Sequence, residues 1–245
     1  MRILVIDDVY TSEQGVARAV EPEGHTVVGV RDPDELRRRL GQDRDFHLAL
    51  VDLHYGRGAT ESGLAALEVL NAHSIPSVVH TLDGEDNRIL FLLAAYEFFP
   101  QTVAVLSKHT SDRPLLQIID ALERKHSPNA SLSQRYRPAP GRTSLLSELV
   151  GRPEDLRVWR ALAQHTKLAV VAKAVNRSQR SVSEFLAKRQ PVIARFEYEF
   201  MDRPMPPEPL EGQRNKPLLE ICSFARFHSD FFSDPDVERL AARWQ

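Results

Sequence analysis

The sequence is poor in residues that crosslink a chain or anchor it in a bilayer. Its 245 residues contain a single cysteine, Cys222, which excludes an intrachain disulfide and argues against a zinc site. No apolar run approaches the roughly 20 residues that span a membrane. The N-terminal MRILVIDD also places charge where a secretory signal needs an apolar core. We therefore expect a cytoplasmic protein that does not contact a membrane.

The chain also lacks a strong net charge, and its formal charge of −2 by itself argues against binding to nucleic acid. The charge is, however, unevenly distributed. Residues 1–125 contain 13 Lys and Arg against 20 Asp and Glu, a net charge of −7. Residues 135–195 contain 13 against 4, a net charge of +9, and residues 196–245 contain 6 against 10, a net charge of −4. This sign asymmetry predicts a polyanionic partner for the middle segment alone.

The acidic half alternates short apolar runs with helical patterns. We predict strands at 2–6, 25–30, 46–51, 75–80 and 102–107, with helices following them up to residue 125. Short, continuously apolar strands that alternate with helices indicate a parallel sheet covered on both faces. The predicted fold of this half is therefore α/β, a doubly wound (βα)5 parallel sheet of the flavodoxin type.

Polar residues stand where four of these five strands end. They are Asp7 and Asp8, Asp52, Thr81 and Lys108. Ligands of such sheets bind at the carboxyl ends of the strands. Three converging carboxylates repel one another, and Mg²⁺ would relieve that repulsion. A lysine and a hydroxyl beside the metal suit a tetrahedral phosphoryl group, which a carboxylate can accept. A single aspartate after a strand is often only a helix cap, but the joint pattern favours a functional site.

The motifs LVIDD, LALVDL, VVHT and VLSK resemble the receiver domain of two-component response regulators. The resemblance spans residues 1–126 and implies that Asp52 accepts a phosphoryl group from a sensor histidine kinase. It implies further that Asp7, Asp8, Asp52 and the backbone carbonyl of His54 bind Mg²⁺, and that Thr81 and Lys108 contact the phosphoryl oxygens. No other catalytic cluster is apparent, so we expect no enzyme activity beyond phosphorylation and dephosphorylation of the receiver itself.

The basic segment carries a helix-turn-helix pattern. A helix is predicted at the start of residues 153–189, followed by a short second helix and a third that begins after Ser178, a good N-cap residue. In the third helix Val182, Phe185 and Leu186 share one apolar face. This part of the chain is thus expected to form an all-α helix-turn-helix domain.

The outward positions of this unit carry side chains that can bind bases and phosphates. The predicted DNA contacts are Lys173, Arg177, Ser178, Gln179, Arg180, Ser183, Glu184 and Lys188. The alternative is an ordinary solvated face of a three-helix bundle. The positions of Ala172, Val175, Ser178, Ser181 and Val182 also resemble the LuxR/NarL-type output domain, although a sigma-factor region would give nearly the same pattern.

Composition divides the chain into four parts. We predict a receiver domain at 1–126, a Ser-, Pro- and Arg-rich linker at 127–142, a helix-turn-helix domain at 143–195 and an extension at 196–245. The extension has a Pro-rich stretch and then an aromatic helical tail. Its aromatic residues are expected to complete the local core; a dimerisation or partner surface is the alternative.

These observations predict a response regulator that controls transcription. In this hypothesis, phosphorylation of Asp52 promotes a homodimer that binds double-stranded promoter DNA. Two alternatives remain open. The chain could regulate a protein partner of the sigma or anti-sigma type, or its receiver could respond to a small-molecule ligand instead of phosphorylation.

Overall fold

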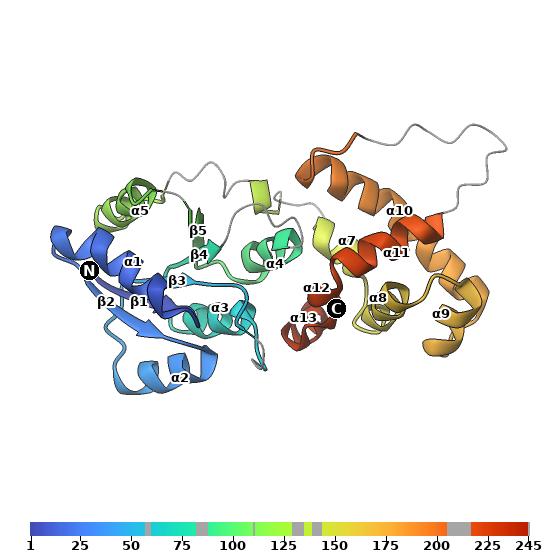
Figure 1. Ribbon diagram of the computed structural model, residues 1–245, viewed down its shortest axis with the longest axis horizontal. Coiled ribbons are helices and arrows are strands. Elements are labelled where there is room, and N and C mark those ends of the chain that lie inside the picture. Colours follow the sequence, from blue (N-terminus) through green and yellow to red (C-terminus); the bar gives the residue numbers. More distant parts are fainter. Residues whose placement is uncertain are drawn as a thin grey trace. The chain divides into compact units, whose positions relative to one another are not determined.

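The computed structural model describes residues 1–56, 60–81, 88–109, 111–128, 135–138, 144–204 and 217–244. The chain divides into two compact units, the first holding residues 1–85 and 91–137 and the second holding residues 86–90 and 138–245 (Figure 1). Most of the predicted linker and of the Pro-rich stretch lies outside the described residues. No described helix is both long enough and apolar enough to cross a membrane.

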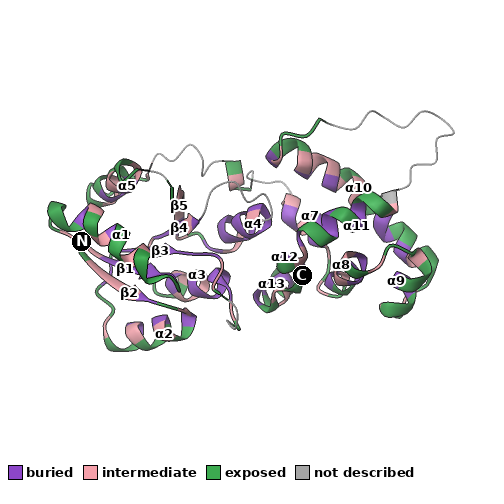
Figure 2. Cartoon of the chain, viewed as in Figure 1, coloured by how far each residue is buried: buried purple, intermediate pink, exposed green. Residues whose placement is uncertain are grey.

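A five-stranded parallel sheet forms the centre of the first unit. Its strand order is β2-β1-β3-β4-β5, which is the doubly wound order that the sequence predicted. The strands are β1 (Arg2–Ile6), β2 (Thr26–Val30), β3 (Leu48–Val51), β4 (Ser77–Thr81) and β5 (Thr102–Ser107). Every residue of β3 is buried, as expected for a strand covered on both faces (Figure 2).

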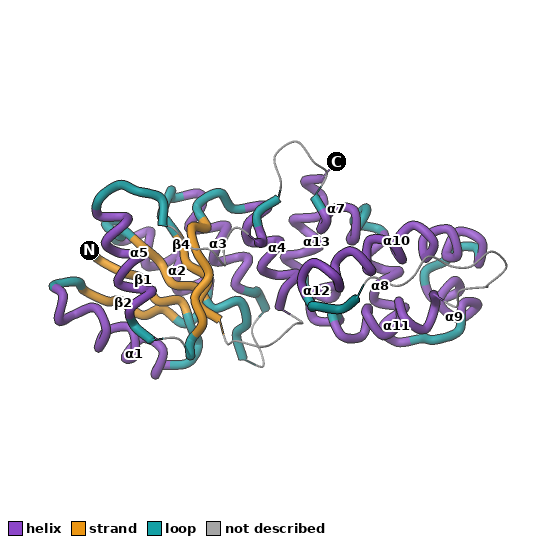
Figure 3. Tube along the Cα trace, turned by 90° about the horizontal axis from the view of Figure 1, so that it is seen from above, coloured by secondary structure: helices purple, strands orange, loops and turns teal. Residues whose placement is uncertain are grey.

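Helices cover both faces of this sheet (Figure 3). They are α1 (Tyr10–Val20), α2 (Pro33–Gln42), α3 (Gly63–Ala72), α4 (Ile89–Phe98) and α5 (Arg113–Glu123). On one face, Val16 and Val20 of α1 and Leu115, Ile118 and Ile119 of α5 form one apolar core with the strands. Because every pair of neighbouring strands is parallel, all five strands end at the same edge of the sheet.

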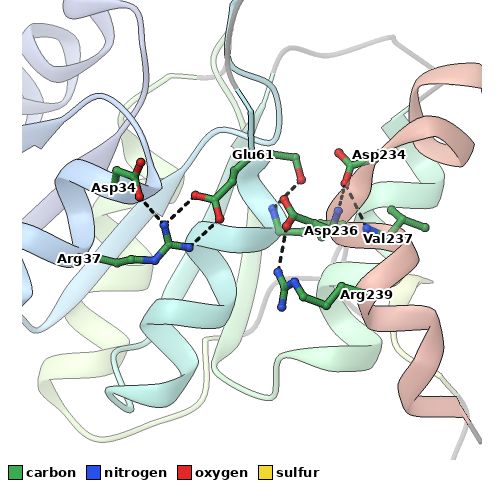
Figure 4. Close-up of polar contacts among 9 residues, drawn as sticks. Asp34, Arg37, Glu61, Asp234, Asp236, Val237 and Arg239 are labelled. Carbon is green, nitrogen blue, oxygen red and sulfur yellow. Dashed lines mark hydrogen bonds and ion pairs between the residues drawn. The ribbon is translucent and has the colours of Figure 1, made fainter.

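Local capping sets where the helices begin. The side chain of Asp32 accepts a hydrogen bond from the Glu35 amide at 2.7 Å, which makes Asp32 the N-cap residue of α2, with Pro33 at the first helical position. Arg37 of α2 is paired with Asp34 and with Glu61, at 2.7 Å in each case (Figure 4). The Glu61 contact connects α2 to the segment that leads directly into α3.

The second unit is entirely helical in its described residues. Its helices are α7 (Leu145–Val150), α8 (Asp155–Gln164), α9 (Leu168–Ala174), α10 (Gln179–Phe200), α11 (Pro217–Phe227), α12 (Ser229–Ser233) and α13 (Pro235–Ala241). Ser178 caps α10 by accepting from the Ser181 amide at 3.1 Å, and Asn176 takes a positive φ of 53° in the turn before it. The predicted helix-turn-helix pair is therefore α9 and α10.

The tail helices complete the core of this unit. The Trp159 ring of α8 stacks on Phe232 of α12, with centroids 4.6 Å apart and an interplanar angle of 4°. Phe224 of α11 lies 5.9 Å from Trp159 and 5.5 Å from Phe196 of α10, again between ring centroids. Helix α10 continues beyond residue 195, the predicted end of the helix-turn-helix domain, and its buried Phe196 packs against Phe224 and His228 of the tail.

Asp234 begins the last helix of the tail. Its carboxylate accepts hydrogen bonds from the amides of Asp236 and Val237, at 2.8 and 3.1 Å, and Arg239 binds Asp236 at 2.9 Å (Figure 4). Val237 and Leu240 on the same helix are buried. The C-terminal helix is thus both capped and packed, as part of the second unit.

Candidate functional site

Strand register brings the predicted acidic residues together at one edge of the sheet. Ile6 pairs with Val51, so Asp7 and Asp52 leave adjacent strands side by side. The Asp52 amide donates to the carbonyl of Ile6 at 2.9 Å, which locks that register. Asp7 is 7% exposed and Asp52 is 6% exposed, whereas Asp8 lies at the surface.

Lys108 joins the two buried carboxylates. Its Nζ lies 2.6 Å from Oδ2 of Asp7 and 2.5 Å from Oδ2 of Asp52, and its side chain is 13% exposed. Burial alone lowers the pKa of this ammonium group, but hydrogen bonds and charge attraction from Asp52 and Asp7 outweigh burial and raise the pKa. Lys108 is therefore protonated and supplies the positive charge that permits two aspartates to be buried together.

Among the described residues, a single cluster of carboxylate side chains could hold a metal ion. Single oxygens of Asp7, Asp8 and Asp52 lie within 4.8 Å of one another. Backbone amides hold two of these side chains in place: Val9 donates to Asp7 at 2.9 Å, and Gly56 donates to Asp8 at 2.6 Å. Carboxylate oxygens on a partly solvated rim are the donor set that suits Mg²⁺, so the chemistry of the residues fits that ion.

Thr81 and His54 lie beside this cluster. Thr81 is the last residue of β4 and 6% exposed, and its carbonyl accepts from the Lys108 amide at 2.8 Å. The His54 amide faces Oδ1 of Asp52 at 3.4 Å. The His54 ring packs edge-on against Phe91, with centroids 4.6 Å apart. The structure thus gathers every residue predicted for the phosphoryl site around Asp52.

Tyr55 is a nearby residue that the sequence reasoning missed. Its hydroxyl is buried and has no hydrogen-bond partner among the described residues. Burial, and then the negative charges of Asp52 and Asp7, raise the pKa of this phenol well above its ordinary value. The phenol consequently stays protonated and can donate to an added acceptor. Only its position three residues after Asp52 could have singled it out.

The predicted DNA contacts are largely exposed on α9, α10 and the turn between them. Seven of the eight are solvent-exposed, and Arg177 is half-buried. The exposed residues are Lys173, Ser178, Gln179, Arg180, Ser183, Glu184 and Lys188. Ser178 also serves as the N-cap of α10, so its hydroxyl is already engaged.

Two of the predicted arginines make ion pairs within the unit. Arg177 binds Asp155 at 2.8 Å, and Arg180 binds Glu184 one turn along α10 at 3.0 Å. Asp155 also forms an ion pair with Arg189 at 3.3 Å, and the guanidinium of Arg189 lies over the Phe185 ring. Asp155, at the start of α8, therefore links the helix-turn-helix turn to α10; sequence reasoning did not identify it.

The fold and the strand-end cluster define a receiver-like α/β domain followed by a helical domain. In sequence, the chain is 33% identical over 87 residues to the response regulator RR06 of Streptococcus pneumoniae, covering 35% of this chain. It spans about 38% of that relative's length. No protein-family model matches the sequence.

Among solved structures, the chain is similar to RcsB. A structure of two RcsB dimers bound to two parallel DNAs matches with a TM-score of 0.53 and 18% identity, covering 91% of this chain and 98% of that one. The RcsB response regulator of Salmonella typhimurium matches in another structure with the same TM-score and identity, over 91% of this chain and 99% of that one. The likeness supports the fold of both units, a five-stranded parallel sheet with helices and a helical C-terminal region. The chain thus resembles a two-component response regulator with a receiver domain and a helix-turn-helix output domain.

Proposed function

We propose that this chain is a cytoplasmic transcriptional response regulator in which phosphorylation of Asp52 controls dimerisation and DNA binding. The observation that carries the proposal is the convergence of Asp7, Asp8, Asp52 and Lys108 at the end of the sheet. Lys108 lies 2.6 Å and 2.5 Å from the two buried carboxylates. A purely structural ion pair would need only one carboxylate beside the lysine. Here three carboxylates have oxygens within 4.8 Å of one another, an arrangement that suits a bound cation and a phosphoryl group.

The proposed phosphoryl transfer uses the residues already in contact. An Asp52 oxygen attacks the phosphorus of a phosphohistidine on a sensor kinase. An O–P bond forms, the P–N bond breaks, and the imidazole nitrogen takes up a proton from water. Phosphorylated Asp52 is an acyl phosphate whose carboxyl group no longer carries a negative charge, so Lys108 is attracted to the phosphoryl oxygens instead. The Thr81 hydroxyl at the end of β4 then donates to the same group.

Asp7, Asp8 and Asp52, together with the backbone carbonyl of His54, would hold Mg²⁺. When bound, the ion supplies positive charge that offsets the charge on the transferred phosphoryl oxygens. The chain's own contribution is orientation: the amides of Val9 and Gly56 hold the carboxylates of Asp7 and Asp8 in place.

Labelling with acetyl phosphate tests this part of the proposal. Full-length protein incubated with acetyl phosphate and Mg²⁺ should gain the mass of one phosphoryl group. Asp52→Asn should not, whereas Asp120→Asn, which alters an exposed carboxylate on α5, should be labelled like wild type. Equal labelling of Asp52→Asn and wild type would contradict the assignment of Asp52.

DNA binding is the second part of the proposal. Its support is the local charge of +9 over residues 135–195 and the exposed polar face at the start of α10. The known DNA complexes of RcsB, which shares the fold, point the same way. A homodimer would place two α10 helices in successive major grooves, roughly 34 Å apart. Gel shifts over promoter fragments should show salt-sensitive binding that Lys188→Glu weakens.

A protein-binding regulator is the second candidate. The observation that favours it is the pairing of Arg177 with Asp155 and of Arg180 with Glu184, which reduces the charge available to phosphates. Leu219 and Phe227 on α11 are also 57% and 48% exposed. Recovery of a sigma or anti-sigma factor with the full chain, together with no DNA binding at low salt, would decide for this function.

A further inference from the structure

A pocket lies beside the carboxylate cluster, between α1, α5 and the ends of β4 and β5. Its volume is about 420 Å³, which is in the range of sites for small organic molecules. Lys108 forms part of its wall and also binds Asp7 and Asp52, so the pocket adjoins the phosphoryl site without coinciding with it.

Small side chains on α1 leave this space open. Gly15 and Ala19 face the pocket, and a β-carbon added at Gly15 would meet no heavy atom within 4 Å. Apolar side chains form part of the wall beside them, namely Val16 of α1, Leu106 of β5 and Leu115 of α5. An apolar body of a ligand would be buried here, with a gain proportional to the area removed from water.

Polar groups in the pocket are not all satisfied within the chain. His80, at the end of β4, contributes to the wall, and its Nδ1 is buried with no hydrogen-bond partner among the described residues. Burial, and then the nearby charge of Lys108, lower the pKa of His80 to about 4, against opposing effects of Asp7 and Asp52. The imidazole is thus neutral, and it adds no charge to the pocket wall. The hydroxyls of Ser12 and Ser111 also line the pocket.

The charge in the pocket favours a cation. The ammonium group of Lys108 is already neutralised by two carboxylates. Asp112, at the N-terminal end of α5, is an exposed residue of the pocket lining and makes no side-chain capping bond. An anionic ligand would meet this carboxylate, whereas an ammonium group would neutralise it.

We propose that the space between α1, β4, β5 and α5 binds a small organic amine, with its apolar body over Gly15 and Ala19 and its ammonium group at Asp112. Polar groups of the ligand would bond with the hydroxyls of Ser12 and Ser111. The proposal concerns binding alone and does not require Asp52 to be phosphorylated.

Matched probes test the proposal on the full chain. 3-Phenylpropylamine, 3-phenylpropan-1-ol and 3-phenylpropanoate share one apolar body and differ only in the terminal group. Titration followed in ¹H–¹⁵N spectra should shift the amides of Gly15, Ser111 and Asp112. A fragment of this size should bind with a dissociation constant of about a millimolar. The amine should bind more tightly than the alcohol, and the alcohol more tightly than the carboxylate.

Two pairs of variants locate the site. Gly15→Leu fills the pocket and should weaken amine binding about tenfold, whereas Gly41→Leu, on α2 with equally open space, should leave it unchanged. Asp112→Asn should reduce the preference for the amine over the alcohol about threefold, because an exposed ion pair contributes little. Asp120→Asn, on the same helix, should not change that preference.

The outcome separates this inference from the proposed function. Binding that is lost in Gly15→Leu and retained in Gly41→Leu supports it. No amide shift with any probe, or equal binding by Gly15→Leu, would overturn it even if Asp52 accepts a phosphoryl group.

Discussion

Burial strongly lowers the pKa of His80, a residue of β4. In the folded chain the pKa of His80 is about 4 instead of 6.5, chiefly because the imidazole is buried. Between these values the unfolded chain binds a proton that the folded chain does not. By linkage, the free energy of unfolding contributed by His80 is fully present above 6.5 and is lost as the pH falls toward 4.

This shift predicts an acid-sensitive stability that His80→Gln should remove. From near-neutral pH to a pH of about 4, wild type should lose about 3 kcal/mol more free energy of unfolding than the variant does. Urea denaturation across this pH range measures the difference. Parallel curves for the two proteins would show that the pKa of His80 is the same in the folded and the unfolded chain.

Asp52 illustrates how residue type and position combine. An aspartate after a strand was expected from the sequence, and its neighbours Asp7, Asp8, Thr81 and Lys108 were each predicted from the same rule. The rule works because parallel strands share one carboxyl edge. Tyr55 and Asp155 were not predicted, since a tyrosine in a loop and an aspartate in a first helical turn have many structural uses.

At the scale of elements, the start of α3 is packed directly on the strand that carries Asp52. Gly63 is the first residue of α3, and a β-carbon there would overlap the backbone of Asp52 and Leu53. Only glycine permits this approach without a shift of the β3–α3 segment. The start of α3 is thus in direct contact with the segment that carries Asp52.

Gly63→Ala should therefore perturb both stability and chemistry. We expect it to lower the free energy of unfolding by about 1–3 kcal/mol, as overpacking does, and to slow labelling of Asp52 by acetyl phosphate. Gly41→Ala on α2 meets open space and should not destabilise the chain. The same behaviour in both variants, measured by urea denaturation and mass spectrometry, would contradict the close contact.

In the second unit, helix α10 extends further along the chain than the local sequence pattern predicts. The turn after Asn176 and the Ser178 cap were readable locally, and α10 begins where they predict. Its end was not readable, because beyond residue 195 the helix is stabilised by long-range packing of Phe196 against Phe224 and His228 of the tail. Pro191 lies within the helix, and tertiary packing outweighs its unfavourable propensity.

At the scale of the whole molecule, the tail is an integral part of the second unit. Phe224 is 4% exposed and contacts both Trp159 and Phe196, while Leu219 on the same helix is 57% exposed. These aromatic rings join α8, α10 and α11 into one core. The unit should consequently unfold as a single body that includes the tail.

Phe224→Ala should destabilise this core by about 3–5 kcal/mol, since it leaves a cavity beside Trp159. Leu219→Ala, at an exposed position of α11, should change stability by less than about 0.5 kcal/mol. Denaturation followed by tryptophan fluorescence measures both. A mild effect of Phe224→Ala would mean that the tail packs loosely on the helix-turn-helix unit.

The sequence by itself determined the strand-and-helix order of the first unit, the strand-end residues and the helix-turn-helix pair. Each of these follows from short-range periodicity, capping and the geometry of parallel sheets. The tertiary structure alone decided that Lys108 neutralises two buried aspartates, that Asp155 restrains Arg177, and that the tail completes the core around Trp159. These contacts join residues far apart in the chain, and long-range pairing depends on packing that no local pattern encodes.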